Sequence, residues 1–477
     1  MGVAYLIVKI RSFCFGLKLR VFSPLNPYFF KLQLASSLAM GPTYTSNLYL
    51  HSHSVLIVLG KILKALPKMH KIDSNIPVSM ASENTCVVLP LSCPPSNWSM
   101  VDWYWKKICG IPFLLRNIFS LQRSGVNSLI IYSNTENTAL HKKLFKENKL
   151  TVKLTFETNI TEVVRATKNH PTLILNGGAL HTKQEIESGM NFINQPDEAL
   201  VYPINRTIMI ETLNKIIMGY KVSLTPSSDD QDSLINFLPG KNESHINKPE
   251  DFLIQHKNLL QSSGLSNDSF MDKTITRFFS RQLTRLFLQT PLSPNMITIL
   301  SLFIGLISAI FFLQGTHENS IIGAGLLLLS AWIDCTDGEV ARLKFSESKI
   351  GGKLDILCDN LVHFSVFFAI GMGSYQSTGN NIFIFFGALA VFGSLVSFLI
   401  LSSSIIDKKE KDATNTGNPK KKNTLTDNMA NRDFIYFLFF MSLIGRVDIF
   451  ICITAFGSNI FAAYLAYSKT KPLLQTN

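Results

Sequence analysis

Four aspartates lie within the 26 residues from 334 to 359. They are Asp334, Asp337, Asp355 and Asp359. The first two are three positions apart and the last two are four apart, so each pair would share one face of a helix. Two neighbouring helices could therefore aim four carboxylates at one point.

A cluster of this kind requires compensating positive charge. The stretch follows a long apolar run, and carboxylates at such a boundary cannot all stay ionised on their own. One charge at a bilayer centre costs roughly 2.5–3.5 kcal/mol on insertion scales. Ligands that are all oxygen favour hard divalent cations, with Mg²⁺ first and Mn²⁺ second. The four aspartates are therefore the predicted metal ligands.

Small residues and one arginine accompany the aspartates. Gly338 and Ala341 lie on the helix face of the first pair, and Gly351 precedes the third aspartate by four residues. They would let a ligand approach the backbone, while Arg342 could meet a phosphate. Taken singly, such residues are more often caps, packing contacts or positively charged flanks of a membrane helix. The conjunction of eight fixed positions favours a site.

The elements that must position these residues are transmembrane helices. A helix needs about 20 residues to cross the hydrocarbon core, and the shorter runs here need polar residues that face the bundle. Six spans are predicted, at 296–314, 321–333, 361–372, 382–406, 434–445 and 449–467.

Charge asymmetry predicts the orientation of these spans. The loop 407–433 carries seven Lys and Arg residues, whereas loops 315–320 and 373–381 carry none. Positive loops stay in the cytoplasm. Both termini and the segment 342–353 are then cytoplasmic, and a bacterial inner membrane is the expected location.

The segment 271–288 mixes apolar and basic residues at helical spacing. This pattern predicts an amphipathic helix on the membrane surface, in contact with lipid. A plain linker helix is the alternative.

The aspartate stretch resembles the signature of the CDP-alcohol phosphatidyltransferases, D-x2-D-G-x2-A-R-x8-G-x3-D-x3-D, without a departure. Pro294 and Asn295, which open the first span, also look like the family's start. The resemblance covers about residues 271–467 of the chain. It implies an all-α fold of six transmembrane helices that is usually dimeric.

The resemblance also implies roles for the motif residues. Asp334, Asp337 and Asp355 would bind metal, and Asp359 would bind metal and act as the general base. Contact with the CDP moiety would come from Gly338, Ala341, Arg342 and Gly351. The expected reaction moves a substituted phosphate from a CDP-alcohol, such as CDP-diacylglycerol, to an alcohol or phospho-alcohol, with release of CMP.

Upstream of this domain, residues 81–260 predict an α/β domain. Buried strands are expected at 86–91, 128–133, 151–156 and 172–177, with helices between them. Such alternation is typical of a parallel sheet covered on both faces. Residues 1–80 form an ill-defined extension, and the polar region 227–267 is expected to be irregular structure and a linker. The membrane domain would occupy 271–470.

Residues 110–133 and 173–180 of this region resemble sugar-phosphate nucleotidyltransferases, which have a Rossmann-like fold. Together with the membrane domain they look like the inositol-phosphate cytidylyltransferase and di-inositol-phosphate-phosphate synthase fusions. Two departures point to a degenerate domain. No glycine follows the first strand in the segment 92–98, and Gly178 stands where the family has a metal-binding Asp.

Composition limits the alternatives. Hydrophobic residues make up 46% of the 477 and charged residues 16%, which suits a protein that lies partly in a membrane. The net charge of +12 lies largely beside apolar runs, so membrane lipid is the expected partner and nucleic acid is not. The seven cysteines form no CxxC pair, which argues against zinc.

Two other functions stay open: a bifunctional cytidylyltransferase and synthase, and a non-enzymatic scaffold or transporter.

Overall fold

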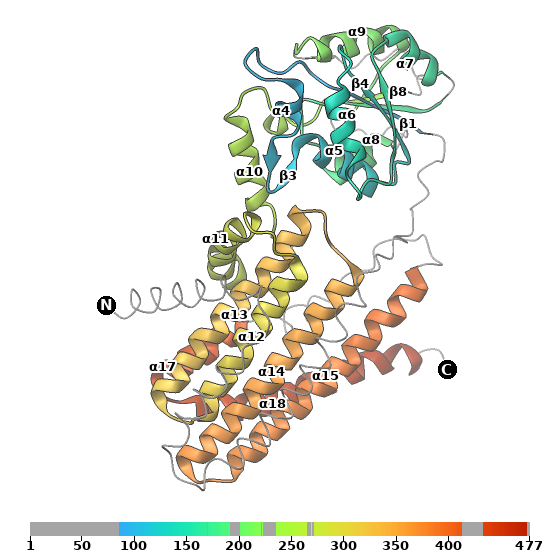
Figure 1. Cartoon of the computed structure of the whole chain (residues 1–477). Helices are drawn as coiled ribbons and strands as arrows, with labels where there is room; N and C mark the ends of the chain where they lie inside the picture. The colour runs from blue at the N-terminus through green and yellow to red at the C-terminus, as the bar shows by residue number, and fades with distance from the viewer. Residues whose placement is uncertain are drawn as a thin grey trace. The chain divides into compact units, whose positions relative to one another are not determined.

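The computed structural model describes residues 85–474, except 169, 191–200, 221, 223–234, 265–268, 270 and 413–432. An α/β region comes first and a helical, apolar region follows it, as predicted (Figure 1). Residues 76–477 form one compact unit. The expected extension 1–80 and most of the basic loop 407–433 lie outside the described residues, and the domain boundaries stay predictions.

A six-stranded sheet organises the α/β region. Its order is β5-β4-β1-β6-β8-β7, and only β7 runs antiparallel to its neighbour among these pairs. The strands are β1 (Cys86–Pro90), β4 (Ser128–Tyr132), β5 (Lys153–Glu157), β6 (Thr172–Leu175), β7 (Tyr202–Pro203) and β8 (Ile235–Leu238). A separate hairpin joins β2 (Lys107–Ile108) to β3 (Ile111–Pro112). The four strands predicted from the sequence are confirmed.

Helices cover both faces of this sheet (Figure 1). They are α4 (Met100–Tyr104), α5 (Phe113–Arg123), α6 (Thr138–Phe145), α7 (Ile160–Ala166), α8 (Lys183–Met190) and α9 (Arg206–Ile217). Successive side chains of a strand point to opposite faces. Val87 and Leu89 accordingly join the apolar cluster that contains α5, while Val88 joins the cluster that contains α7 and α9. The run of buried residues in β1 is what a parallel sheet requires.

The expectation of irregular structure at 227–267 is wrong in part. Strand β8 lies there, followed by a short 3-10 helix, η2 (Asn242–Ser244), and by α10 (Asp251–Gln261). All four residues of β8 are buried, and Phe237 pairs with Ile174 of β6. Three apolar residues and Asn236 within a polar stretch carry little local signal, and β8 is stabilised by the strands beside it.

The helical region contains eight helices in the described residues. They are η3 (Asp272–Thr276), α11 (Arg277–Leu288), α12 (Pro294–Leu313), α13 (His317–Leu343), α14 (Lys349–Thr378), α15 (Ile382–Asp412), α17 (Asp433–Ile444) and α18 (Val447–Leu474). Five of them, α12 to α15 and α18, are long and apolar enough to cross a membrane. The apolar helix α17 has only 12 residues. A multi-pass membrane region is thus confirmed at the level of five helices, and the count of six stays a prediction.

Close backbone contacts hold the long helices together. Helix α12 packs along both α13 and α14, and α15 packs along α14 and α18 (Figure 1). A Cβ atom added to Gly373 would lie 2.0 Å from the carbonyl oxygen of Phe312, and one added to Gly371 would lie 2.7 Å from Cα of Gly387. Small residues at helix contacts of this kind are typical of membrane bundles.

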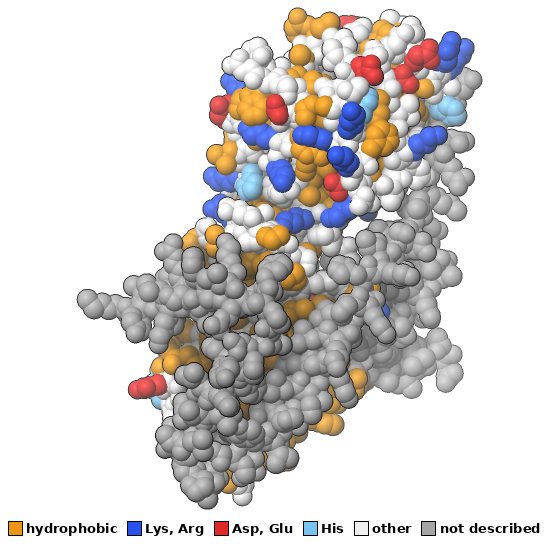
Figure 2. All heavy atoms as spheres, viewed as in Figure 1, with side chains coloured by type: hydrophobic (Ala, Val, Ile, Leu, Met, Phe, Trp, Pro, Cys, Tyr) orange, Lys and Arg blue, Asp and Glu red, His pale blue; other side chains and the backbone are white. Residues whose placement is uncertain are grey.

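The surface differs between the two regions. Figure 2 shows Lys and Arg side chains scattered among apolar and acidic ones on the visible face of the α/β region. The helical region exposes large apolar side chains, among them Phe385, Phe392 and Phe456. Apolar exposure on this scale suits contact with lipid better than contact with water.

Candidate functional site

Two helices carry the four aspartates, and a third lies against both. Helix α13 ends at Leu343, and Ser348 caps the start of α14, with its Oγ accepting a hydrogen bond from the amide of Gly351 at 2.9 Å. The connection between them is only five residues long, and Phe345 within it has a φ of 52°. Helix α12 contacts both α13 and α14, so the aspartates gather beside α12.

Three of the carboxylates converge. One oxygen from each of Asp334, Asp337 and Asp355 lies within 4.8 Å of the other two. Asp334 is 5% exposed and Asp337 is 7% exposed. Such buried carboxylates repel one another unless a cation lies between them. An all-oxygen set at this spacing fits a hard divalent ion.

Asp359, one turn further along α14, is half-buried and is not in this group of three. The role predicted for it as a base and ligand stays a prediction.

Hydroxyl groups of α12 hold the first two aspartates. Ser301 Oγ donates a hydrogen bond to Asp334 Oδ1 at 3.2 Å, and Thr298 Oγ1 donates a short one to Asp337 Oδ2. Both hydroxyls are buried. Each donor orients a carboxylate, as partners of metal ligands commonly do. Neither residue was predicted from the sequence, although their spacing of three along α12 matches that of the aspartates.

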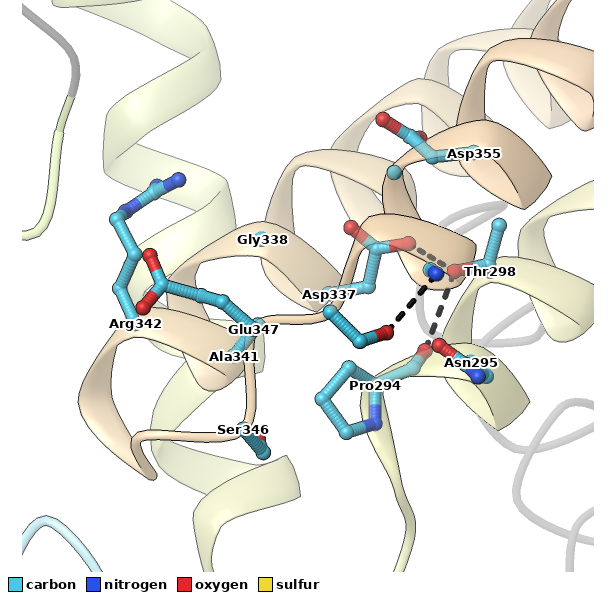
Figure 3. Close-up of a pocket in the computed structure, with 13 residues that line it drawn as sticks. Pro294, Asn295, Thr298, Asp337, Gly338, Ala341, Arg342, Ser346, Glu347 and Asp355 are labelled. Atoms are coloured by element: carbon cyan, nitrogen blue, oxygen red, sulfur yellow. Dashed lines mark hydrogen bonds between the residues drawn. The ribbon is translucent and has the colours of Figure 1, made fainter. Parts of the chain in front are cut away.

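A pocket of about 160 Å³ opens beside this cluster (Figure 3). Six of the eight predicted residues line it: Asp337, Gly338, Ala341, Arg342, Gly351 and Asp355. The start of α12 contributes Pro294, Asn295 and Thr298, and the loop before α14 contributes Ser346 and Glu347. Asp334 and Asp359 are outside the lining.

The glycine at position 351 is needed for the approach of α14 to α12. A Cβ atom there would lie 2.9 Å from Asn295 Oδ1 and 2.9 Å from Ser348 Oγ. Any side chain would therefore displace the residues that form this wall of the pocket. The space beside the backbone of Gly351 is thus used by Asn295, and the contact of Gly351 with a ligand stays a prediction.

Arg342 lies at the pocket, where the sequence analysis expected a phosphate contact. Its Nε and Nη2 donate hydrogen bonds to the carbonyl oxygen of Ser263, at 3.0 and 2.8 Å. The guanidinium is thereby anchored to the segment that precedes α11. A guanidinium carries five N–H donors and two of them are used here, so Arg342 can still present the other N–H groups to an anion.

The ends of strands β1 and β6 in the α/β region offer a contrast. A Cβ atom on Gly177 would lie 2.1 Å from the carbonyl oxygen of Pro90, and one on Gly178 would lie 3.0 Å from Ser92 Oγ. The Ser92 hydroxyl is hydrogen-bonded to Tyr104 at 3.1 Å. The two glycines therefore pack closely against the end of β1, and the degenerate character predicted for this region stays a prediction.

Comparison with known proteins agrees with the site in the helical region. Residues 291–462 match the family model described as CDP-alcohol phosphatidyltransferase, which confirms the predicted resemblance for this segment. The "Bifunctional IPC transferase and DIPP synthase" of Thermococcus kodakarensis is 27% identical over 187 residues, or 39% of each chain.

The "Archaetidylinositol phosphate synthase" of Pyrococcus horikoshii is 36% identical over 83 residues, which are 17% of this chain and 42% of that protein. The chain therefore aligns with less than half the length of these two relatives. Among solved structures, Mycobacterium tuberculosis phosphatidylinositol phosphate synthase with CDP-DAG bound is 16% identical, with a TM-score of 0.31. That match covers 40% of this chain and 92% of the other.

Proposed function

We propose that the helical region is a membrane-embedded phosphotransferase, which moves a substituted phosphate from a CDP-alcohol to an acceptor hydroxyl and releases CMP. The observation that carries the proposal is the convergence of three aspartates within 4.8 Å beside a pocket lined by six of the eight motif residues. The match of residues 291–462 to the family supports it.

The motif aspartates would hold the metal. Asp334, Asp337 and Asp355 supply carboxylate oxygens, and Asp359 is proposed as a further ligand. Mg²⁺ and Mn²⁺ are both hard ions that bind oxygen ligands, and we expect Mg²⁺ first. When bound, a divalent ion neutralises charge on the diphosphate as the anhydride breaks.

The remaining steps belong to the protein's own groups. Gly338, Ala341 and Gly351 let the cytidine diphosphate lie against the helices, and Arg342 donates to its phosphate oxygens. Asp359 accepts the proton of the acceptor hydroxyl. The hydroxyl oxygen forms a bond to the phosphorus that bears the alcohol, the bond from that phosphorus to the bridging oxygen breaks, and CMP leaves with the electron pair.

The finer points of location and partners are part of this proposal. We expect six spans, with the site and the α/β region on the cytoplasmic side of a bacterial inner membrane, and assembly as a homodimer. The proposed donor is a CDP-alcohol such as CDP-diacylglycerol, and lipid would surround the apolar helices. Inositol, glycerol phosphate and serine are candidate acceptor chemistries.

The test is an assay of CMP release by the full chain in lipid nanodiscs. CDP-diacylglycerol and CDP-inositol would be offered with candidate acceptors, with and without Mg²⁺. We expect release that depends on Mg²⁺ and on Asp359. Release that is unchanged by Asp359→Asn, with Asp448→Asn as a matched control outside the motif, would contradict the proposal.

A second function is favoured by one observation. The Thermococcus kodakarensis relative is named as bifunctional, and an α/β sheet precedes the helical region here. The α/β region could then make a CDP-polyol for the membrane site. Incubation of the full chain with CTP and inositol phosphate tests this, because cytidylyl transfer must release pyrophosphate. We expect none, because no glycine follows β1 in the segment 92–98 and Gly178 stands where the resembling family has a metal-binding Asp.

The non-enzymatic alternative, a scaffold or transporter, predicts no CMP release at all. Transport favours acidic residues spread across the bilayer. Three of the motif carboxylates instead converge at one place.

A further inference from the structure

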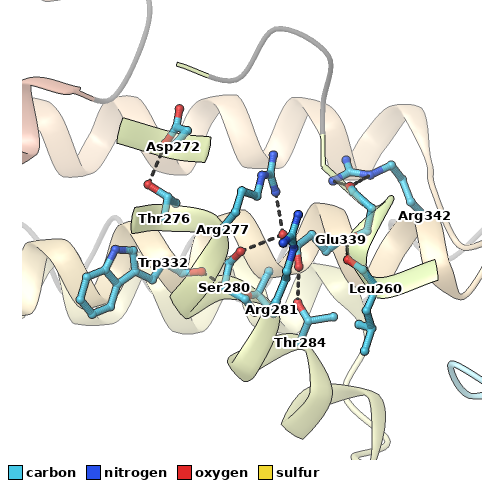
Figure 4. Close-up of polar contacts among 12 residues, drawn as sticks. Leu260, Asp272, Thr276, Arg277, Ser280, Arg281, Thr284, Trp332, Glu339 and Arg342 are labelled. Atoms are coloured by element: carbon cyan, nitrogen blue, oxygen red, sulfur yellow. Dashed lines mark hydrogen bonds and ion pairs between the residues drawn. The ribbon is translucent and has the colours of Figure 1, made fainter. Parts of the chain in front are cut away.

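A buried ion pair lies on the side of α13 that faces α11. Arg277 Nη1 and Glu339 Oε1 are 2.6 Å apart, and the Glu339 side chain is fully buried (Figure 4). Ser280 Oγ donates to Oε1 at 2.8 Å, and Thr284 Oγ1 donates to Oε2 at 2.6 Å. Both carboxylate oxygens are therefore satisfied by α11 alone.

Helix α11 turns its polar side inward. Its buried positions include Arg277, Ser280 and Thr284, whereas Phe278 and Leu286 are 62% and 61% exposed. The two-sided pattern predicted for this segment is present in α11, and its contact with the membrane surface stays a prediction. Polar contacts at these positions act together with apolar packing, such as that of Phe279 against Trp332, in setting how the two helices register.

Burying two charges is costly unless their geometry is well satisfied. A pair of apolar residues of similar volume would often serve stability equally well. The best-attested use of a buried polar pair is to select one register of two helices over others.

The pair lies opposite the metal cluster on the same helix. Glu339 follows Asp337 by two positions, which is roughly 200° around an α-helix. The α11-facing side of α13 continues through Thr336 to Trp332, whose ring stacks on Phe279 at 4.0 Å between centroids. One side of α13 is therefore held by α11 while the other presents carboxylates to α12.

We infer that Arg277 and Glu339 are positioning residues, which set the rotation of α13 so that Asp334 and Asp337 point at the shared site. A rotation of about 20° would move a side-chain tip some 5–6 Å from the helix axis by about 2 Å. A binding site tolerates about 0.5 Å. The inference rests on the proposed function, since it concerns how that site is held.

The experiment uses the full chain in nanodiscs and three readouts: Mn²⁺ affinity by electron paramagnetic resonance, CMP release, and melting temperature. The variants are Arg277→Met, Glu339→Leu and the double variant. Each single change breaks the ion pair and leaves the remaining charge buried, so the melting temperature falls. In the double variant we expect the melting temperature to recover in large part, while Mn²⁺ binding and kcat/KM stay at least tenfold weaker than in the wild type.

Glu339→Asp is the second test, because it keeps the charge and shortens the side chain by one methylene. We expect a folded protein with Mn²⁺ affinity reduced severalfold. The matched control is the exposed pair Arg446 and Asp448, 3.1 Å apart, replaced by Met and Leu, which should leave all three readouts unchanged.

Two results separate this inference from the proposed function. Wild-type Mn²⁺ affinity in a folded double variant, or in folded Glu339→Asp, would overturn the positioning role and leave the proposed function standing. A wild-type chain that binds Mn²⁺ but releases no CMP from any CDP-alcohol would overturn the proposed function. The comparison of Mn²⁺ affinities would then still decide the role of the pair.

Discussion

The two regions of this molecule differ in what surrounds the residues that could carry chemistry. In the helical region three carboxylates lie within 4.8 Å of one another beside an open pocket. At the strand ends of the α/β region, Gly177 lies against the carbonyl oxygen of Pro90, and the neighbouring Ser92 is bonded to Tyr104. The comparison shows that the fold alone does not determine whether a site exists, because a site depends on particular residues.

The α/β region has a structural use for its own buried charge. Arg116 of α5 is 5% exposed, and it donates hydrogen bonds to the carbonyl oxygens of Ile108 at 2.8 Å and Leu343 at 2.6 Å. Its guanidinium also lies 5.4 Å from the ring centre of Phe345. An arginine of the α/β region thus holds the end of α13, close to the motif.

The largest effect is expected in the carboxylate cluster. Asp337→Asn removes one charged ligand and should lower CMP release by at least about 100-fold, as loss of a charge-stabilising group commonly does. Treatment with EDTA should have a similar effect that Mg²⁺ reverses. Asp448→Asn, outside the motif, is the control. Activity that survives both EDTA and Asp337→Asn would remove the contrast between the two regions.

A smaller effect is expected from the hydroxyls of α12. Thr298→Val keeps the shape of the side chain but removes the donor to Asp337, and such partners are worth about 10- to 100-fold in metal affinity. Titration with Mn²⁺ measures it. Ser308→Ala on the same helix is the control, because Ser308 Oγ is buried without a hydrogen-bond partner among the described residues. Equal affinities in the two variants would argue against the orienting role.

The α/β region should respond in stability rather than in chemistry. Burial lowers the pKa of Arg116 to about 10, so it stays charged at neutral pH. Arg116→Met leaves two carbonyl groups without their donor, which should cost about 1–3 kcal/mol. Thermal unfolding followed by tryptophan fluorescence reports it, since three of the four tryptophans lie at 98–105. Arg165→Met, at an exposed pair with Glu162, should change the stability by less than about 0.5 kcal/mol.

The smallest effect concerns pH. Burial lowers the pKa of His181 from 6.5 to about 4, and its Nδ1 has no hydrogen-bond partner among the described residues. The unfolded chain therefore takes up a proton before the folded one, and stability is lost as the pH falls below about 6.5. We expect a loss of about 0.7 kcal/mol from pH 7 to pH 6. His181→Gln, which can keep the bond to Asn176, should flatten this slope; an unchanged slope would count against the assignment.

Local patterns were sufficient for much of the molecule. Helix periodicity places Asp334 with Asp337, and Asp355 with Asp359, so the sequence predicted that all four would converge. Three of them do, and the part of Asp359 stays a prediction. The apolar runs predicted the long helices, and alternation of strands and helices predicted the parallel sheet. Each of these inferences depends on residues that are close in the chain.

Only the tertiary structure decided which distant residues complete the site. Ser301 and Asp334 are 33 positions apart, and Arg277 and Glu339 are 62 apart. Hydrogen bonds between helices leave no local signature, because the partners of a polar side chain depend on how whole helices pack. Strand β8 was missed for the same reason, because this four-residue segment, with three apolar residues and Asn236, becomes a strand only when β6 lies beside it.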